Sequence, residues 1–346
     1  MQLVHQRQHT QPRLSVVIMM RNEAATIGWT LDSLHRQELD EPFEVIFVDG
    51  ASDDGTIETI VEHPLSERVD TTIAVLPPEN SGMCVAQNVG AELARGAILL
   101  FMQADLRVRS PRGLADTMRC FDDPDVLGTT FVGLGPDELF DRYDFWGQVF
   151  MSRYVGDRVE KDFDLKFNAV RSDVFEQIGG FDEERLPLGG NDFDFEHRLR
   201  DFGDATGGVV AESRVEVEHL HALGKPHTPA GLFKKYCRNS EVAGATAALY
   251  HRYRRRVPGY WSRVVQQWGL VLLCVVSLVP LTWPLAPLLV VAGGFWWNRK
   301  AYRYVRDPRL ILVPAFSVAA LYAFAWYFTA GVVRGKTLYE FDNRMR

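Results

Sequence analysis

Acidic residues stand at three places in the sequence where carboxylates could do chemistry. Asp105 follows the apolar run at 97–102 (AILLFM), and Asp49 follows another such run at 43–48 (FEVIFV). Apolar runs of strand length predict parallel strands buried on both faces. Ligands in open α/β sheets bind at the carboxyl ends of the strands, so we expect both carboxylates at that edge.

Asp105 is the candidate metal ligand. Magnesium and similar divalent ions prefer oxygen donors, often one or two carboxylates together with substrate phosphates. Gln103 would lie on the same strand face and offers a neutral oxygen. The run at 215–221 (VEVEHLH) alternates as a strand does and places His219 and His221 on one face, from which His219 could reach a metal or a diphosphate. The alternative to a metal site is that Asp105 is only a turn residue and that His219 and His221 have structural roles.

The segment 49–56 (DGASDDGT) precedes a predicted helix that begins at Thr56. We expect Asp53 or Asp54 to cap this helix. That role does not account for Asp49, which could accept hydrogen bonds from a nucleobase or a ribose hydroxyl.

A third acidic group lies in the glycine-flanked run 189–200 (GGNDFDFEHRLR). Asp192 and Asp194 would complement the dipole of a helix that starts there. As a functional group, one of these carboxylates could act as general base on an acceptor hydroxyl.

The elements that would position these residues alternate between strand and helix. The pattern predicts an α/β fold with a doubly wound, mostly parallel sheet in a catalytic domain at 14–228, after a flexible tail at 1–13. The expected strands are 14–20, 43–48, 73–76, 97–102, 167–170 and 215–221, and the expected helices begin near Asn22 and Thr56 and span 85–94 and 174–178.

The C-terminal third has a different composition. Aromatic and basic residues mix at 229–263, as in amphipathic helices at a membrane interface, and the segment 264–335 predicts two to three transmembrane helices broken at Pro280, Pro284 and Pro287, before a tail at 336–346. Basic residues at 252–256 and 299–309 place the catalytic domain on the cytoplasmic face.

The overall composition narrows the classes of partner. The formal net charge is −7 and basic residues concentrate from Lys234 onward, which argues against nucleic acid and favours a membrane surface. The four cysteines show no CxxC pairing, so neither a zinc site nor a disulfide framework is indicated. The oligomeric state stays open.

Six segments in order resemble the motifs of family 2 glycosyltransferases, which are inverting enzymes with the GT-A fold. The C-terminal spans are similar to those of polyprenyl-phosphate sugar transferases in that family. The segments are SVVIMMRNEAATI, VDGASDDGT, NVGAELARGAILLFMQADLRV, IGGFDE, GGNDFDFEHRLRDFG and VEHLH.

The resemblance implies a role for each matching position. Asp105 would hold Mg²⁺ or Mn²⁺ with Gln103 and His219, and Asp192 would be the catalytic base, with Asn191 and Asp194 on the acceptor side. The nucleotide-sugar donor would be bound by Arg21, Asn22, Glu23, Asp49, Ser52, Asn88 and Ala104.

Three residues depart from the family pattern. Gln103 replaces the first Asp of the D-x-D metal motif, Asn191 replaces the Glu before the base, and Gln87 stands where Arg commonly precedes Asn88. These changes concern metal affinity, the orientation of the acceptor and a contact to the donor phosphate, respectively.

The expected function is a membrane-anchored inverting glycosyltransferase that moves a sugar from a nucleotide-sugar to a lipid-linked acceptor, either a polyprenyl phosphate or a lipid-linked glycan. A lipid phosphate needs no base, and Asp192 would then orient it. Gln103 and Asn191 motivate a non-catalytic nucleotide-binding scaffold as the alternative. A nucleotidyltransferase would release pyrophosphate, and the N-terminal region has no glycine-rich basic phosphate loop to support that activity. The sugar, the nucleotide base and the acceptor stay open.

Overall fold

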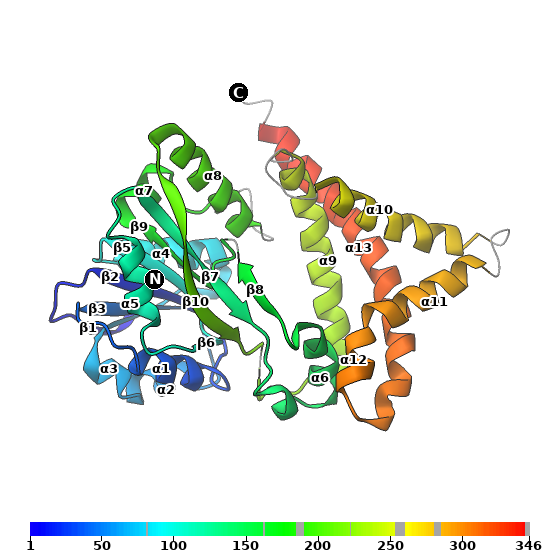
Figure 1. Cartoon of the computed structure of the whole chain (residues 1–346), viewed down its shortest axis with the longest axis horizontal. Coiled ribbons are helices and arrows are strands. Elements are labelled where there is room, and N and C mark those ends of the chain that lie inside the picture. Colours follow the sequence, from blue (N-terminus) through cyan, green and yellow to red (C-terminus); the bar gives the residue numbers. More distant parts are fainter. Residues whose placement is uncertain are drawn as a thin grey trace. The chain divides into compact units, whose positions relative to one another are not determined.

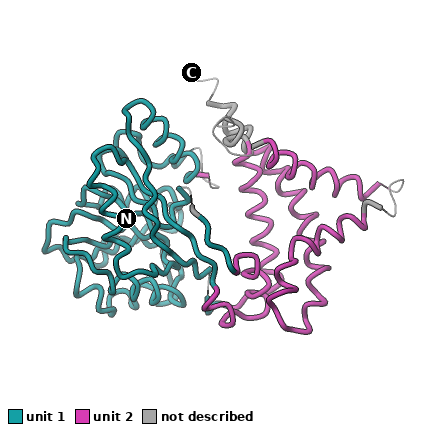
Figure 2. The backbone as a smooth tube through the Cα atoms, viewed as in Figure 1, with its two compact units in different colours: residues 1–136, 156–187, 191–225 teal, residues 137–155, 188–190, 226–346 magenta. Residues whose placement is uncertain are grey.

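The computed structural model describes residues 1–80, 82–161, 163–184, 190–221, 223–252, 260–279 and 285–342. The chain divides into two compact units (Figure 2). Unit 1 comprises Met1–Pro136, Gly156–Pro187 and Asn191–Lys225, and unit 2 comprises Asp137–Val155, Leu188–Gly190 and Pro226–Arg346.

Unit 1 is built on one mixed sheet. Within the described residues ten strands form it in the order β1-β4-β3-β2-β5-β9-β7-β10-β6, with β8 paired to β7. Strands β4, β3, β2 and β5 are parallel neighbours, while β1, β9, β8 and β6 pair in the antiparallel sense. The strands are β1 (Gln2–Arg7), β2 (Leu14–Met20), β3 (Phe43–Asp49), β4 (Asp70–Val75), β5 (Ile98–Gln103), β6 (Leu106–Val108), β7 (Val126–Leu134), β8 (Arg158–Lys161), β9 (Phe167–Arg171) and β10 (Val209–His219).

Helices cover both faces of the parallel part, because its strands are apolar on both sides. In β2, Val16 and Ile18 belong to the core cluster shared with α1 and α5, whereas Val17 belongs to the opposite cluster shared with α4, α7 and α8. Figure 1 shows the two helical layers on either side of the sheet. The helices of unit 1 are α1 (Ile27–His35), α2 (Thr56–Glu62), α3 (Leu65–Arg68), α4 (Met83–Leu93), α5 (Gly113–Cys120), α7 (Ser172–Gln177) and α8 (Asn191–Thr206).

Three details differ from the sequence-based expectations. Residues 2–7, expected in a flexible tail, form β1, which pairs with β4 and closes that side of the sheet. The helix expected near Asn22 begins at Ile27, because Asn22 adopts a positive φ of 56° and residues 21–26 form a loop. The strand at 167–171 runs antiparallel to β5, so the sheet is mixed beyond the β4-β3-β2-β5 block.

Unit 2 is helical in the described residues. Its long helices α9 and α13 lie so close that a Cβ at Gly244 would collide with the Phe328 carbonyl, and one at Gly331 with the Glu241 carbonyl. The helix expected at a membrane interface thus packs along the apolar helix. The helices are α6 (Phe145–Met151), α9 (Pro229–Arg252), α10 (Tyr260–Ser277), α11 (Leu285–Trp297), α12 (Arg299–Tyr304) and α13 (Val313–Asp342).

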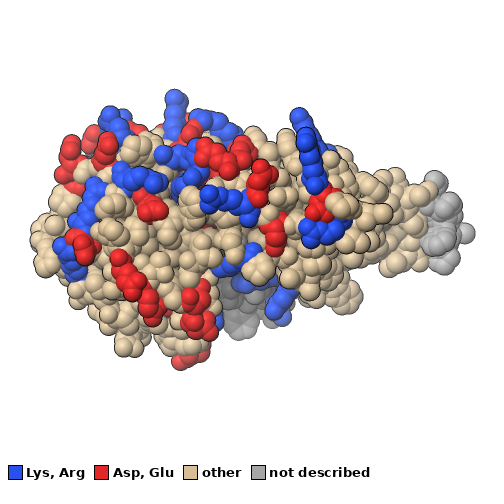
Figure 3. Space-filling model, turned by 90° about the horizontal axis from the view of Figure 1, so that it is seen from below, with Lys and Arg blue, Asp and Glu red and all other residues tan. Residues whose placement is uncertain are grey.

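Among the described residues one helical stretch, Pro308–Arg334, is long and apolar enough to cross a bilayer, and Pro287–Trp297 is a shorter apolar helix. The described structure therefore offers one candidate span where two to three were expected. Large apolar side chains are exposed on α10, such as Trp261 and Leu272, and on α13, such as Trp326. In Figure 3, the end formed by α10 and α11 is almost free of charged side chains. The breaks expected at Pro280 and Pro284, and most of the basic run at 252–256, lie outside the described residues.

Candidate functional site

Two loops at the carboxyl edge of β2 and β3 are joined by hydrogen bonds through Ser52. Its hydroxyl donates to Asp49 Oδ1 and accepts from the backbone N–H of Asn22 at 2.8 Å, and its own N–H donates to Asp49 Oδ2 at 2.8 Å. The backbone N–H of Asp53 donates to Asn22 Oδ1 at 3.0 Å. The structure thus brings Asn22, Asp49 and Ser52 together as expected, with Asp49 fully buried and both its oxygens bonded by Ser52. A contact between Asp49 and a nucleotide stays a prediction.

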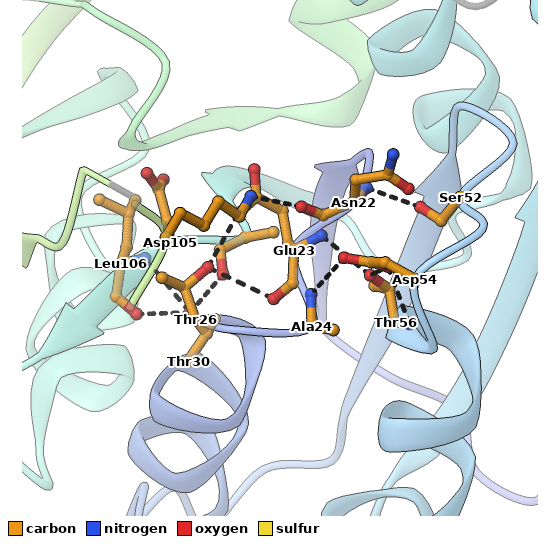
Figure 4. Close-up of polar contacts among 12 residues, drawn as sticks. Asn22, Glu23, Ala24, Thr26, Thr30, Ser52, Asp54, Thr56, Asp105 and Leu106 are labelled. Carbon is orange, nitrogen blue, oxygen red and sulfur yellow. Dashed lines mark hydrogen bonds and ion pairs between the residues drawn. The ribbon is translucent and has the colours of Figure 1, made fainter. Parts of the chain in front are cut away.

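Asp54 joins the same two loops. Its carboxylate accepts from the N–H of Ala24 at 3.1 Å and from the N–H of Thr56, the first residue of α2, at 3.2 Å. The N-cap position itself is Gly55, so neither of the two neighbouring aspartates takes the capping position expected of one of them. Burial would raise the pKa of Asp54, but the hydrogen bonds from Thr56 and Ala24 lower it below its usual value. Figure 4 shows this chain of contacts along the sheet edge, with Glu23 between Asn22 and Asp105.

Asp105 contacts His219 because of the register between β6 and β10. Leu106 pairs with His219 in the antiparallel ladder, so the preceding residue, Asp105, reaches the histidine ring. His219 Nε2 lies 3.0 Å from Asp105 Oδ2, and both side chains are about five-sixths buried, at 17% and 16% exposure. The ring of His221 lies 3.5 Å from that of His219, so the two histidines are neighbours as expected.

The donor set around Asp105 fits a divalent ion only in part. Asp105 and His219 supply one carboxylate oxygen and one ring nitrogen, and Gln103 ends β5 two residues before Asp105, opposite Met19. No cluster of three acidic, histidine or cysteine side chains suited to a metal occurs among the residues that the structure describes. A divalent ion at Asp105 would therefore need ligands beyond the described acidic, histidine and cysteine side chains.

Asp192 lies in the first turn of α8, where the Phe193 N–H donates to its Oδ1 at 2.8 Å. Burial raises the pKa of Asp192 above its usual range, and this hydrogen bond and the charge of Lys166 oppose the rise only in part. A carboxylate with a raised pKa binds a proton more readily than an ordinary aspartate does.

Two other predicted site residues, Asp194 and Asn88, bond to other residues of the chain. Asp194 is buried and pairs with Arg198 at 2.7 Å, and Arg198 also donates to the carbonyls of Ile178 and Gly180. Asn88 accepts from the N–H of Phe181 at 2.9 Å and donates to its carbonyl and to Glu183. The structure supports the helix-stabilising interpretation of Asp194, and Asn88 holds the loop that precedes α8.

The remaining predicted residues lie around the Asn22 loop. Arg21 is exposed, and Glu23 accepts from the Thr26 hydroxyl at 2.8 Å. Ala104 is buried, and its carbonyl accepts from the Thr30 hydroxyl at 2.7 Å. These contacts fix the loop and the end of β5 without a ligand.

Sequence reasoning missed Lys225 and the contact between Gln87 and Asn191. Lys225 donates to the Asn22 carbonyl and lies 3.0 Å from Glu23, which adds a cation beside the Asn22 loop. Gln87 accepts a 2.9 Å hydrogen bond from Asn191, next to Asp192. Lys225 belongs to no recognisable motif. Gln87 and Asn191 both depart from the family pattern, but nothing in the sequence indicates that they contact each other.

Comparison with known proteins supports this assignment of the fold. The model of the family described as Glycosyl transferase family 2 matches residues 15–179. Glycosyltransferase AglE of Haloferax volcanii is 29% identical over 199 residues, which cover 56% of this chain and 63% of AglE. The uncharacterized glycosyltransferase YfnE of Bacillus subtilis is 36% identical over 98 residues, which cover 27% of this chain and 23% of YfnE. The chain thus spans less than two thirds of the length of these curated relatives.

A solved structure covers more of the chain. The mannosyltransferase PcManGT from Pyrobaculum calidifontis, in complex with GDP-Man and Mn²⁺, superposes with a TM-score of 0.53 at 18% identity and covers 94% of this chain and 87% of its own. At this identity the likeness concerns the fold. The mixed sheet and its helical layers match a GT-A type of fold, and residues 15–179 are similar to the family 2 glycosyltransferases.

Proposed function

We propose that the chain is a membrane-anchored inverting glycosyltransferase that moves a sugar from a nucleotide-sugar donor to a lipid-linked acceptor. The observation that carries this proposal is the Asp105–His219 pair, held at 3.0 Å at the carboxyl end of β5. This is the edge where ligands bind in open α/β sheets.

The nucleotide would bind over the two loops that Ser52 and Asp54 tie together. Hydrogen bonds hold Asn22, Ser52 and Asp49 in place without a ligand, so the loops lose little freedom on binding. Lys225 and the exposed Arg21 add positive charge to this loop, which suits an anionic donor.

Asp105 and His219, with Gln103 as a neutral oxygen donor, would hold a Mg²⁺ or Mn²⁺ ion through the donor's diphosphate. The ion would supply charge neutralisation for the leaving nucleoside diphosphate. Because Gln103 is uncharged, we expect weaker metal binding than two carboxylates would give.

Asp192 would act on the acceptor. In an inverting transfer the acceptor oxygen forms the new bond to the anomeric carbon as the bond to the diphosphate breaks, so one base suffices and no protein nucleophile is needed. The raised pKa of Asp192 suits it to take the proton of an acceptor hydroxyl. An acceptor phosphate carries no proton to remove, and Asp192 would then orient it.

Two features of unit 2 support the membrane and the lipid acceptor in this proposal. The 27-residue stretch Pro308–Arg334 can cross a bilayer, and the basic residues at 299–309 precede it on the side we assign to the cytoplasm. A mostly apolar cavity of about 180 Å³ lies within this unit, with Arg153 and Tyr236 at its polar part and Ala243, Leu321 and Phe324 among its apolar walls. An apolar chain with an anionic head has the chemistry for such a cavity.

The test is a screen of radiolabelled nucleotide-sugars on membranes that contain the full chain, followed by lipid extraction. Label should enter the lipid fraction and should be lost in Asp105→Ala and Asp192→Ala while the protein level is unchanged. Asp204→Ala, an exposed acid on the same helix as Asp192, is the matched control and should retain transfer.

The non-catalytic scaffold makes a different prediction. It would bind nucleoside diphosphates with an affinity that ignores manganese and would transfer no label to any acceptor. Full transfer by both alanine variants would refute the assignment of the site, and label confined to water-soluble products would refute the lipid acceptor.

A further inference from the structure

Three arginines lie on the segment that joins the two apolar stretches of unit 2. Arg299 and Arg303 belong to α12, and Arg306 follows the end of that helix. All three side chains are exposed. Arg299 donates to the carbonyl of Trp296 at 3.0 Å, and none of the three pairs with a carboxylate among the described residues. The segment therefore presents three guanidinium groups that lack a counter-charge from the described chain.

The other side of α12 packs into unit 2 and so directs the arginines outward. Ala301 is 0% exposed and Val305, directly after the helix, is 3% exposed. Lys300 is also used by the fold, because it donates to the Arg153 carbonyl at 2.9 Å. The two arginines of α12 are four residues apart and thus share one face of the helix. Their exposure follows from the packing of α12.

Large apolar side chains are exposed on both sides of the arginines along the chain. Trp296, near the end of α11, is 57% exposed, and Ile311, within the stretch Pro308–Arg334 that can cross a bilayer, is 82% exposed. The guanidinium carbon of Arg299 lies 4.5 Å from the centroid of the Trp296 ring. Water would leave these apolar groups unburied, and hydrocarbon would leave the guanidinium groups unsolvated. The boundary between lipid chains and headgroups satisfies both kinds of side chain.

The local charge balance indicates which headgroup fits. Between positions 299 and 309 the chain carries five basic residues and one acid, namely Arg299, Lys300, Arg303, Arg306 and Arg309 with Asp307. Arg309 pairs with Asp307 at 2.7 Å, so the excess charge lies on the residues before this pair. A guanidinium group can donate two parallel hydrogen bonds to a phosphate, and basic segments at a membrane surface gain affinity from anionic lipids. A zwitterionic headgroup offers the phosphate without the net charge.

We propose that Arg299, Arg303 and Arg306 bind the phosphate groups of anionic phospholipids in the leaflet beside α12. The inference rests on the membrane anchor of the proposed function and adds a partner to it. This partner is a bulk membrane lipid that the transfer reaction does not consume.

The first experiment measures which lipid the full chain retains. The protein is purified in detergent with equal amounts of phosphatidylglycerol and phosphatidylcholine that have the same acyl chains, and the bound lipids are counted by native mass spectrometry. We expect the wild type to retain phosphatidylglycerol over phosphatidylcholine by about fivefold or more. The triple variant Arg299→Gln, Arg303→Gln, Arg306→Gln should retain the two lipids about equally.

A matched control removes the same charge from unit 1. It is the triple variant Arg36→Gln, Arg112→Gln, Arg119→Gln, in which all three arginines are exposed, and it should keep the wild-type preference. A second measurement needs no substitution. Raising the ammonium acetate concentration from about 0.05 M to about 0.5 M should bring the wild-type preference close to one, because salt screens exposed charges.

The outcomes separate this inference from the proposed function. If the wild type stays in solution without detergent and retains neither lipid, the membrane anchor fails and the inference fails with it. If the wild type needs detergent but retains both lipids equally, the anchor stands and the role of the arginines is refuted. A preference that persists in the glutamine variant of α12, or at high salt, refutes that role as well.

Discussion

Two carboxylates of unit 1, Asp70 at the amino edge of the parallel sheet and Asp192 at the start of α8, differ in how fully the chain pairs them. At the amino edge, Glu44 at the start of β3 and Asp70 at the start of β4 are 1% and 3% exposed, and Arg95 bonds both. Asp70 accepts three further hydrogen bonds from His9 and Thr10, at 2.8 to 2.9 Å. The chain itself thus pairs both of these carboxylates.

At the carboxyl edge Ser52 bonds both oxygens of Asp49, while Asp105 and Asp192 have other kinds of partner. Asp105 meets a histidine, and Asp192 accepts a backbone hydrogen bond but has a raised pKa because burial outweighs its partners. At the amino edge burial also acts on Asp70, yet hydrogen bonds from Arg95, Thr10 and His9 outweigh it and lower the pKa of Asp70 to about 2. The balance between burial and hydrogen bonding thus separates carboxylates that stabilise the fold from those available for chemistry.

The largest expected effect comes from removing the cation of the amino edge. Arg95→Leu would leave Glu44 and Asp70 buried beside each other without a counter-charge, and we expect a loss of about 3–5 kcal/mol in the free energy of unfolding. Urea unfolding of the full chain in detergent measures it. Arg119→Leu breaks an exposed pair with Asp116 and should change stability by less than about 0.5 kcal/mol. Equal losses of unfolding free energy in Arg95→Leu and Arg119→Leu would contradict the stabilising role assigned to Arg95.

Two isosteric substitutions, Asp192→Asn and Asp70→Asn, should have opposite effects on activity and stability. Asp192→Asn should lower transfer to a hydroxyl acceptor about 100-fold or more and leave stability unchanged or higher, since the amide avoids burying a charge. Asp70→Asn should cost about 2 kcal/mol of stability and leave kcat of the folded protein unchanged. Transfer rates and urea unfolding curves are measured on both variants. A stability loss in Asp192→Asn as large as that in Asp70→Asn would contradict the different roles assigned to these two carboxylates.

The strands that end at the carboxyl edge were predictable from sequence because each is a continuous apolar run. The apolar runs at 14–20 and 43–48 match β2 and β3 within a residue, since a strand buried on both faces needs side chains that are apolar at successive positions. Asp49 and Asp105 follow from such boundaries, whereas Asp192 follows from the glycine-flanked start of a helix. Strand direction leaves no trace in such a run, which is why the antiparallel placement of β9 was not predictable.

The contacts that decide which acids are structural join residues far apart in the chain. Arg95 meets Asp70 across 25 residues and Glu44 across 51, and Asn191 meets Gln87 across 104. Spacing rules describe neighbours within one helix or strand, so they could not pair these side chains. The β1 strand was missed for the same reason, because Gln2–Arg7 is polar and becomes a strand through its pairing with β4.

The smallest expected effect is the pH dependence of stability. The folded pKa of Asp70, about 2, lies below the unfolded value of about 3.9, so the unfolded state binds more protons as the pH falls. Its stabilisation is fully present above about pH 4 and is lost as the pH falls toward 2, with about 1 kcal/mol gone by pH 3. Asp192 has a raised pKa, so its contribution has the opposite sign: it is present at low pH and lost as the pH rises through the folded pKa.

Unfolding free energies measured from pH 6 to pH 3 should therefore separate the two edges. Asp70→Asn should be less stable than the wild type at pH 6 and lose less stability on acidification, because the proton-linked part is gone. Asp192→Asn should lose more stability on acidification than the wild type, because the group that gains from protonation in the folded state is absent. Parallel curves for the wild type and both variants would show that neither carboxylate has a pKa perturbed by folding.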